Sequence, residues 1–179
     1  SCDRGPEVVV CPPFTTLPAV VAAAKGSRLK VGAQNIHWAE KGAFTGEISG
    51  AMLTTAGATH VIVGHSERRQ YFGETDETVN KRLQAGLANG LTVIVCVGEQ
   101  LLERVDGTTK AVVERQVRAA LAGVDAAAMS KVIIAYEPVW AIGTGKVATT
   151  VEAQEVHAFI RALLKQIFVG SNVAETTRI

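Results

Sequence analysis

Two segments of the sequence carry side chains that could take part in acid–base chemistry. His65 follows the apolar run HVIVG, and Glu137 follows the apolar run KVIIAY. An imidazole placed before a helix N-terminus is kept neutral by the helix dipole and can donate a hydrogen bond to a substrate carbonyl. A carboxylate partly desolvated at the rim of an apolar core can serve as a general base near neutral pH. Taken alone, each could equally be structural, as a satisfied histidine or a carboxylate bonded to backbone amides or an arginine.

The loop after Glu137 favours the catalytic interpretation. Pro138–Lys146 is apolar, contains Trp140 and carries two glycines. An exposed apolar loop is costly unless it closes on something, and glycines let backbone amides approach a phosphate oxygen. We therefore expect a lid over a phosphorylated substrate. The GTGK stretch is not a P-loop, because Trp140 stands where the first glycine is required and Val147 where Ser or Thr is required.

Five short apolar runs must supply the elements that position these residues. They are continuously apolar rather than alternating, which is typical of strands buried on both faces of a parallel sheet. The runs are Val8–Pro12, Leu29–Asn35, His60–His65, Thr92–Glu99 and Lys131–Glu137.

Helical patterns lie between the runs. Residues 76–90, 109–123 and 149–168 repeat apolar side chains at helical spacing, and Thr149 and Glu152 have the spacing of a capping box. Shorter helices are expected over Thr16–Lys25 and Ser49–Gly57. Strand–helix alternation predicts a parallel α/β sheet with right-handed crossovers. An open doubly wound sheet and a β/α barrel both fit, and both place functional residues at the carboxyl ends of the strands.

Composition narrows the class of protein. The 179 residues suit one domain, and 18 basic against 17 acidic residues give a net charge of +1. That balance gives no reason to expect nucleic acid or an anionic membrane as a partner. The cysteines at 2, 11 and 96 form no C-x-x-C pair, which favours a reducing cytoplasm over a disulfide framework or a thiolate metal site. We expect no signal peptide in the first residues, no transmembrane helix and no metal cluster.

Several motifs together resemble those of the triosephosphate isomerase family. They are QNIHWAEKGAFTGEIS, HVIVGHSERRQYFGETDE, VCVGE and AYEPVWAIGTGK, in the family order, within a likeness that runs from VVVCPPFT to SNVAETTRI. The resemblance implies a (β/α)8 barrel, the TIM barrel, that interconverts dihydroxyacetone phosphate and glyceraldehyde 3-phosphate in the cytoplasm. It implies no cofactor and no metal. The pairing of the His65 and Glu137 contexts argues against another phosphate-binding β/α enzyme.

The resemblance also assigns roles by position. Glu137 is the base that moves a proton between two substrate carbons, and His65 is the neutral electrophile that polarises the carbonyl. Gly143 contributes the lid amide that contacts the substrate phosphate. Glu67 corresponds to a carboxylate beneath the active site, although a glutamate in a first helical turn can simply stabilise its helix. Cys96 corresponds to a packed cysteine near the catalytic glutamate, and we favour a structural role for it.

The segment Gln34–Ser49 resembles the family's interface loop. It contains Trp38 and Phe44, which suit burial against another chain, and Thr45 corresponds to the residue that reaches the neighbouring subunit's active site. A solvated surface loop is the alternative. The resemblance favours a homodimer.

The length departs from the family pattern. A closed barrel of this type has about 250 residues, and the resemblance maps the chain to the second to sixth βα units. We expect residues 1–179 to form a single partial barrel domain, in which the first and the last two units are not represented. Two explanations stay open. The sequence is part of a full-length enzyme, or it is an inactive fragment that self-associates through open strand edges or binds a partner.

Overall fold

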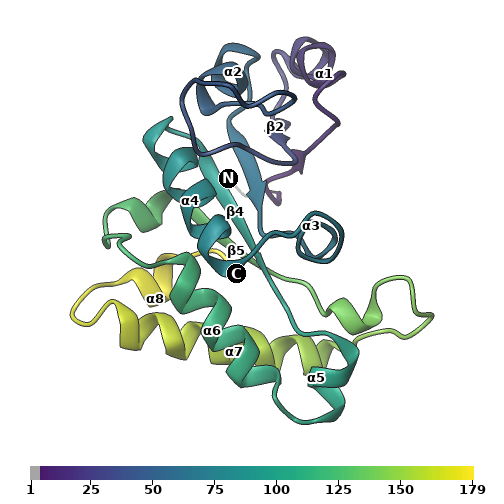
Figure 1. Ribbon diagram of the computed structural model, residues 1–179. Coiled ribbons are helices and arrows are strands. Elements are labelled where there is room, and N and C mark those ends of the chain that lie inside the picture. Colours follow the sequence, from purple (N-terminus) through teal and green to yellow (C-terminus); the bar gives the residue numbers. More distant parts are fainter. Residues whose placement is uncertain (1–4) are drawn as a thin grey trace.

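The computed structural model describes residues 5–179, whose strands form one parallel five-stranded sheet in the order β1–β2–β3–β4–β5 (Figure 1). Every strand pairs in parallel with the next one along the chain. The strands are β1 (Val9–Val10), β2 (Lys30–Ala33), β3 (His60–Val63), β4 (Thr92–Val97) and β5 (Val132–Tyr136). An unbroken sequential order belongs to a β/α barrel, because a doubly wound sheet reverses its order. The curled sheet is therefore part of a TIM barrel.

Helices connect the strands as the sequence predicted. The long helices are α4 (Asp76–Ala88), α6 (Thr109–Ala120) and α7 (Thr150–Ile167). The expected short helices are α1 (Leu17–Ala24) and α2 (Gly50–Thr55). Further short helices are α3 (Ser66–Tyr71), α5 (Leu101–Val105) and α8 (Val173–Thr176), with 3₁₀ turns at Ala128–Lys131 and Val139–Ala141. The capping box of Thr149 and Glu152 opens α7, as predicted.

The core lies between the outer face of the sheet and helices α4, α6 and α7. Buried members include Val61, Val63, Val93, Val95, Val79, Leu83, Val113, Val117, Ile160 and Leu164. The strand residues that alternate with these, such as Ile62, Ile94 and Ile133, are only partly buried. Because both faces of each strand are largely apolar, the strands read as continuous apolar runs rather than as alternating patterns. No helix within residues 5–179 combines the length and the apolar character that crossing a bilayer requires.

The strands end earlier than the apolar runs do. β3 stops at Val63, and Gly64 then turns the chain with a φ of +73° so that His65 becomes the N-cap of α3. β5 stops at Tyr136, one residue before Glu137. The run Val8–Pro12 forms only the two-residue strand β1. Both candidate catalytic residues thus stand just beyond the carboxyl ends of their strands. Of the three cysteines, Cys2 lies outside the described residues.

Candidate active site

His65 and Glu137 meet beyond the carboxyl ends of β3 and β5. The Nε2 atom of His65 lies 3.4 Å from Oε2 of Glu137, with 34% of the imidazole and 16% of the carboxylate side chain exposed. The two residues are 72 positions apart in sequence, and the parallel sheet places them at one edge. An imidazole nitrogen and a carboxylate therefore face the same small space, which is the arrangement that proton abstraction next to a carbonyl requires.

The start of α3 sets the orientation of the imidazole. The backbone N–H of Glu67 donates to Nδ1 of His65 at 3.3 Å, so that nitrogen acts as an acceptor. A neutral ring that accepts at Nδ1 carries its proton on Nε2, the nitrogen that faces Glu137. The hydrogen bond at Nδ1 thus leaves Nε2 as the ring nitrogen that would donate to a substrate.

Ser66 holds the carboxylate of Glu137 at both oxygens. Its backbone N–H donates to Oε1 at 2.7 Å, and its hydroxyl donates to Oε2 at 3.0 Å. The backbone of Glu137 is held separately, because its N–H donates to the carbonyl of Val97 at 2.9 Å. Pro138 follows and leads the chain out of the sheet. Hydrogen bonds thus fix Glu137 at both its carboxylate and its backbone.

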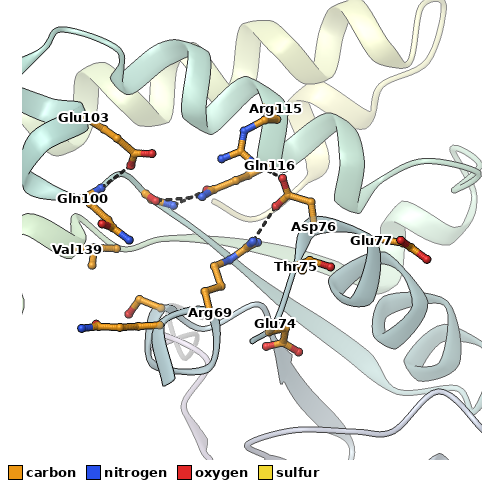
Figure 2. Close-up of a pocket in the computed structure, with 13 residues that line it drawn as sticks. Arg69, Glu74, Thr75, Asp76, Glu77, Gln100, Glu103, Arg115, Gln116 and Val139 are labelled. Carbon is orange, nitrogen blue, oxygen red and sulfur yellow. Dashed lines mark hydrogen bonds and ion pairs between the residues drawn. The ribbon is translucent and has the colours of Figure 1, made fainter. Parts of the chain in front are cut away.

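A polar cavity of about 590 Å³ adjoins Ser66, between α3, the start of α4 and the second half of α6 (Figure 2). Arg69 and Asp76 form an ion pair of 2.7 Å at its wall, and Arg115 pairs with the other oxygen of Asp76. The cavity is lined by Ser66, Arg69, Gln70, Glu74, Thr75, Asp76, Glu77, Gly98, Gln100, Glu103, Arg115, Gln116 and Val139. Its walls include Ser66 and the residues Gly98 and Gln100 after β4, and His65 is not among them.

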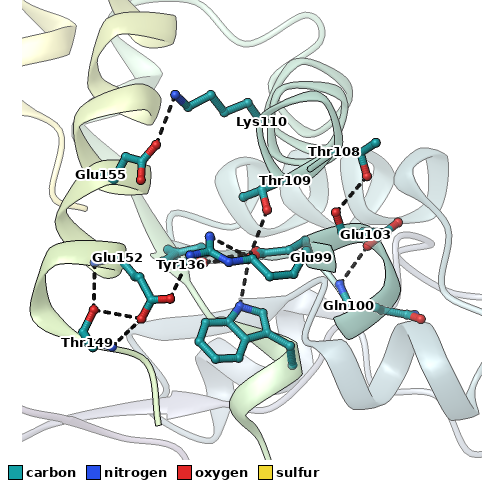
Figure 3. A network of polar contacts seen from close by, with 12 residues as sticks. Glu99, Gln100, Glu103, Thr108, Thr109, Lys110, Tyr136, Thr149, Glu152 and Glu155 are labelled. Atoms are coloured by element: carbon teal, nitrogen blue, oxygen red, sulfur yellow. Dashed lines mark hydrogen bonds and ion pairs between the residues drawn. The ribbon is translucent and has the colours of Figure 1, made fainter. Parts of the chain in front are cut away.

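A fully buried carboxylate, Glu99, anchors the base of the loop that the sequence predicts as a lid (Figure 3). It accepts hydrogen bonds from Nε1 of Trp140 at 2.9 Å, from the Tyr136 hydroxyl at 3.1 and 3.2 Å, and from the Thr109 hydroxyl at 3.4 Å. Arg104 lies 3.6 Å from it. Sequence reasoning gave Glu99 no role, although VCVGE was among the motifs that carried the resemblance.

The loop differs in one respect from the exposed apolar segment that the sequence suggested. Trp140 is only 7% exposed, because its indole packs inward to reach Glu99. The outer part of the loop does expose apolar side chains, with Ile142 48% and Val147 83% accessible. Gly143 has a φ of +68° and open space around its Cα. The loop therefore has an anchored base and an exposed tip.

The residues assigned near the site have different environments. Glu67 is 68% exposed at its side chain, and its carboxylate lies 3.7 Å from Nδ1 of His65. Cys96 is buried, and burial followed by the negative charge of Glu137 raises the pKa of its thiol well above the usual range. Cys11 is partly buried, and both thiols are free. Glu67 and Cys96 thus lie close to the pair, on its open and its packed side respectively.

The segment Gln34–Ser49 projects from the end of β2 without regular structure over most of its length. Trp38 stacks on the ring of His37 and Phe44 packs against the same ring at a tilt, each with ring centroids 4.4 Å apart. The two side chains nevertheless remain 38% and 46% exposed. Thr45 is exposed beside them.

An ion-paired cluster that the sequence did not reveal fixes the base of this segment. Glu74 is buried, lies 2.7 Å from Arg82 and 3.5 Å from Arg68, and Arg82 donates to Oδ1 of Asn35 at 3.1 Å. Arg82 also donates to the carbonyl of Ile36. The cluster connects α3, α4 and the start of the segment.

Comparison with known proteins agrees with this geometry. A sequence model of the family described as "Triosephosphate isomerase" matches residues 2–179. The triosephosphate isomerase of Acetivibrio thermocellus is 57% identical over 177 residues, which make up 99% of this chain and 70% of that protein. That of Solibacter usitatus is 56% identical over 97% of this chain and 69% of its own length. That of Moorella thermoacetica is 59% identical over 90% of this chain and 65% of its own length. The chain belongs to the triosephosphate isomerase family.

Proposed function

We propose that the protein interconverts dihydroxyacetone phosphate and glyceraldehyde 3-phosphate, with Glu137 as the base and His65 as the electrophile. The observation that carries this proposal is the 3.4 Å approach of His65 Nε2 to Glu137 Oε2 at the carboxyl edge of the sheet. The comparisons also support the proposal, because the similar proteins are named triosephosphate isomerases.

The geometry suggests how the proton moves. Glu137 removes a proton from the substrate carbon beside the carbonyl, and Nε2–H of His65 donates to the carbonyl oxygen as it gains negative charge. In the resulting enediolate the proton of the neighbouring hydroxyl passes to the former carbonyl oxygen by way of Nε2 of His65, and Glu137 returns its proton to the former carbonyl carbon. One C–H bond and one O–H bond are broken and one of each is formed, so ketose and aldose interconvert without loss of atoms. Because Ser66 donates one hydrogen bond to each oxygen of Glu137, each oxygen keeps a second lone pair that can take the substrate proton.

The remaining assignments concern residues around this pair. The exposed tip of the loop brings the Gly143 amide to the substrate phosphate when the loop closes, which excludes water from the enediolate. Glu67 influences the imidazole through the 3.7 Å approach to Nδ1. Cys96 packs behind Glu137 as a small buried side chain.

Two substitutions test the catalytic pair. We expect Glu137→Asp and His65→Gln each to lower kcat by orders of magnitude in the isomerisation of glyceraldehyde 3-phosphate, while the circular dichroism spectrum stays unchanged. Glu114→Gln is the matched control, because it removes one exposed carboxylate of α6 and leaves the site intact. Near-normal turnover in either of the first two variants would refute the assignment. An inactive wild-type chain would instead favour the barrel fragment that self-associates or binds a partner.

The homodimer is a further part of the proposal. It is supported by the exposed Trp38, Phe44 and Thr45 on a segment whose base is held by buried ion pairs. We expect the wild type to sediment as a dimer and Thr45→Arg to shift the equilibrium towards monomer, whereas Thr176→Arg on α8 serves as an exposed control. Heterogeneous aggregates in the wild type would contradict a specific dimer and would point to open strand edges.

We also propose that the protein works in the cytoplasm, as the odd number of cysteines suggests. The free thiols of Cys11 and Cys96 are consistent with a reducing compartment. Fractionation of the source cells tests this location, and recovery of the protein outside the cytoplasmic fraction would contradict it.

A further inference from the structure

Gly98 lies directly against the backbone of Glu137. A Cβ atom built on Gly98 would be 1.7 Å from the carbonyl oxygen of Glu137 and 2.8 Å from its carbonyl carbon. The residue follows the last residue of β4, Val97, whose own carbonyl accepts the N–H of Glu137. Glycine is needed here for space. Any displacement of the Gly98 peptide would press on the main chain that carries the base.

Gly98 lies one residue beyond the end of β4, and its backbone is hydrogen-bonded by the side chain of Gln116. The N–H of Gly98 donates to Oε1 of Gln116 at 2.8 Å, and Nε2 of Gln116 donates to the carbonyl of Gly98 at 3.2 Å. Figure 2 shows this side chain reaching from α6 to the chain after β4. One carboxamide thus supplies the acceptor and the donor that a strand backbone would otherwise provide.

Gln116 stands out on its helix. Its neighbours on the buried face of α6 are Val112, Val113, Val117 and Ala120, whereas Gln116 is polar and only 5% exposed. A buried amide is costly unless it is hydrogen-bonded, and the two bonds to Gly98 meet that requirement. An apolar residue would satisfy the core equally well. The two hydrogen bonds to the Gly98 backbone therefore explain why this buried position holds glutamine.

We propose that Gln116 is a positioning residue for the reaction: it fixes the Gly98 peptide and thereby the place of Glu137 relative to His65. The proposal rests on the proposed function of Glu137 as the base. Glu137 has three attachments, namely its N–H on Val97, its carbonyl against Gly98, and its carboxylate on Ser66. Gln116 acts on the second of these from outside the barrel, without touching the substrate.

The first test compares Gln116→Met with Val113→Ala. Methionine has nearly the shape of glutamine but offers no strong donor or acceptor, and Val113 is a fully buried neighbour on the same helix face. We expect Gln116→Met to lower kcat about 10- to 100-fold, the usual result of a small misplacement of a catalytic group. KM and the affinity for phosphoglycolate, an enediolate mimic, should change by less than about twofold, since the loss lies in the chemical step.

The control separates positioning from stability. Val113→Ala should lower Tm by at least as much as Gln116→Met and leave kcat within about twofold of wild type. If Gln116→Met keeps a wild-type kcat, or if both variants lose kcat in proportion to their loss of Tm, the proposal is overturned.

A second measurement does not need activity. In Gln116→Met the amide hydrogen of Gly98 loses its acceptor, and displacement of Glu137 should release the amide hydrogen of Ser66 from Oε1. Both amides should exchange faster with solvent than in the wild type, while that of Val95 within β4 should not. If the wild type were inactive and Gln116→Met still showed this faster exchange, the result would contradict the proposed function but support the positioning. Unchanged exchange at Ser66 would overturn the positioning.

A further variant covers the case in which Gln116→Met does not fold. In Gln116→Glu the introduced carboxyl, when protonated, offers one donor and one acceptor, as the amide does, and when ionised it has no donor for the Gly98 carbonyl. We expect kcat of this variant to fall as pH rises through the titration of that carboxyl, relative to the wild-type profile. A pH profile that runs parallel to wild type would overturn the proposal.

Discussion

Replacing Glu99 by glutamine tests whether a buried carboxylate holds the base of the loop that we propose as a lid. The carboxylate is fully buried and receives hydrogen bonds from Trp140, Tyr136 and Thr109, with Arg104 at 3.6 Å. All of these groups act as donors towards Glu99. The amide of glutamine keeps one acceptor oxygen for Trp140 and Thr109 and places an NH₂ group where Oε2 stood. Only the Tyr136 hydroxyl faces that position, and it must then accept a hydrogen bond there instead of donating one.

The expected loss is about 2–3 kcal/mol. A hydrogen bond to a charged group contributes about 1.5–3 kcal/mol and one to a neutral group about 0.5–1.5, so each strong bond weakens by about 1 kcal/mol. Two bonds lose the charged acceptor here, those from Trp140 and Tyr136, and the second of them must also reverse its direction, because the amide donates to the Tyr136 hydroxyl. Arg104 adds little, since it is partly exposed and also pairs with Glu152 at 2.9 Å.

Urea unfolding of Glu99→Gln and Glu114→Gln provides the measurement. Glu114 makes an exposed pair with Arg118 four residues away on α6, so the same chemical change should cost less than about 0.5 kcal/mol there. A second reading comes from Tyr136, because burial, and then the charge of Glu99, raises the pKa of its hydroxyl. The ultraviolet titration of Tyr136 should move to lower pH in Glu99→Gln.

A Glu99→Gln variant that is no less stable than wild type would also have a physical explanation. Burying an ionised carboxylate costs solvation energy, and replacing it by a neutral group can recover that energy. If Glu99→Gln were as stable as wild type or more stable, desolvation would outweigh the three hydrogen bonds, and the reasoning above would be refuted.

Three further predictions concern other residues. Burial lowers the pKa of His60, and the negative charge of Glu7 opposes this effect. The unfolded chain therefore binds a proton at His60 more readily than the folded protein does. The free energy of unfolding should be highest above about pH 6.5 and should decrease as the pH falls towards the lower pKa of the folded state. Thermal melts between about pH 7 and pH 5 check this, and His60→Asn should flatten the slope. Gly98→Ala should lower kcat by more than about 100-fold, because its Cβ would lie 1.7 Å from the Glu137 carbonyl oxygen; retention of activity would contradict the packing. The thiol of Cys96, whose pKa burial raises, should resist alkylation in the folded protein and react in urea, and rapid labelling without denaturant would show the burial to be wrong.

The main elements of the fold could be predicted because their signals are local. The apolar runs at 60–65, 92–99 and 131–137 became strands, and helices α4, α6 and α7 followed their apolar periodicity. The choice between a barrel and a doubly wound sheet was not local, since it depends on which strands pair. Short helices such as α5 and α8 were missed because four or five residues are too few to show a period.

The candidate site divides in the same way. His65 and Glu137 could be found because a polar residue at the end of an apolar run is visible in the sequence. Glu99 and Gln116 could not be assigned a task, because the sequence does not show that a polar side chain is buried or what it contacts. Glu99 accepts a hydrogen bond from Trp140, and Gln116 binds the backbone of Gly98. In both pairs the two residues are far apart in sequence, so neither contact shows in the local pattern.

Arg104 shows how the buried network bears on the loop between β5 and α7. One nitrogen of its guanidinium lies 3.6 Å from Glu99, and another lies 2.9 Å from Glu152, while its plane lies 5.3 Å from the Trp140 ring. Glu99 and Trp140 fix the start of the loop, and Glu152 belongs to the capping box that fixes its end. Both ends are therefore tied to one side chain on α5. The closure that we propose would therefore move only the segment between them, where the two glycines and the exposed apolar side chains lie.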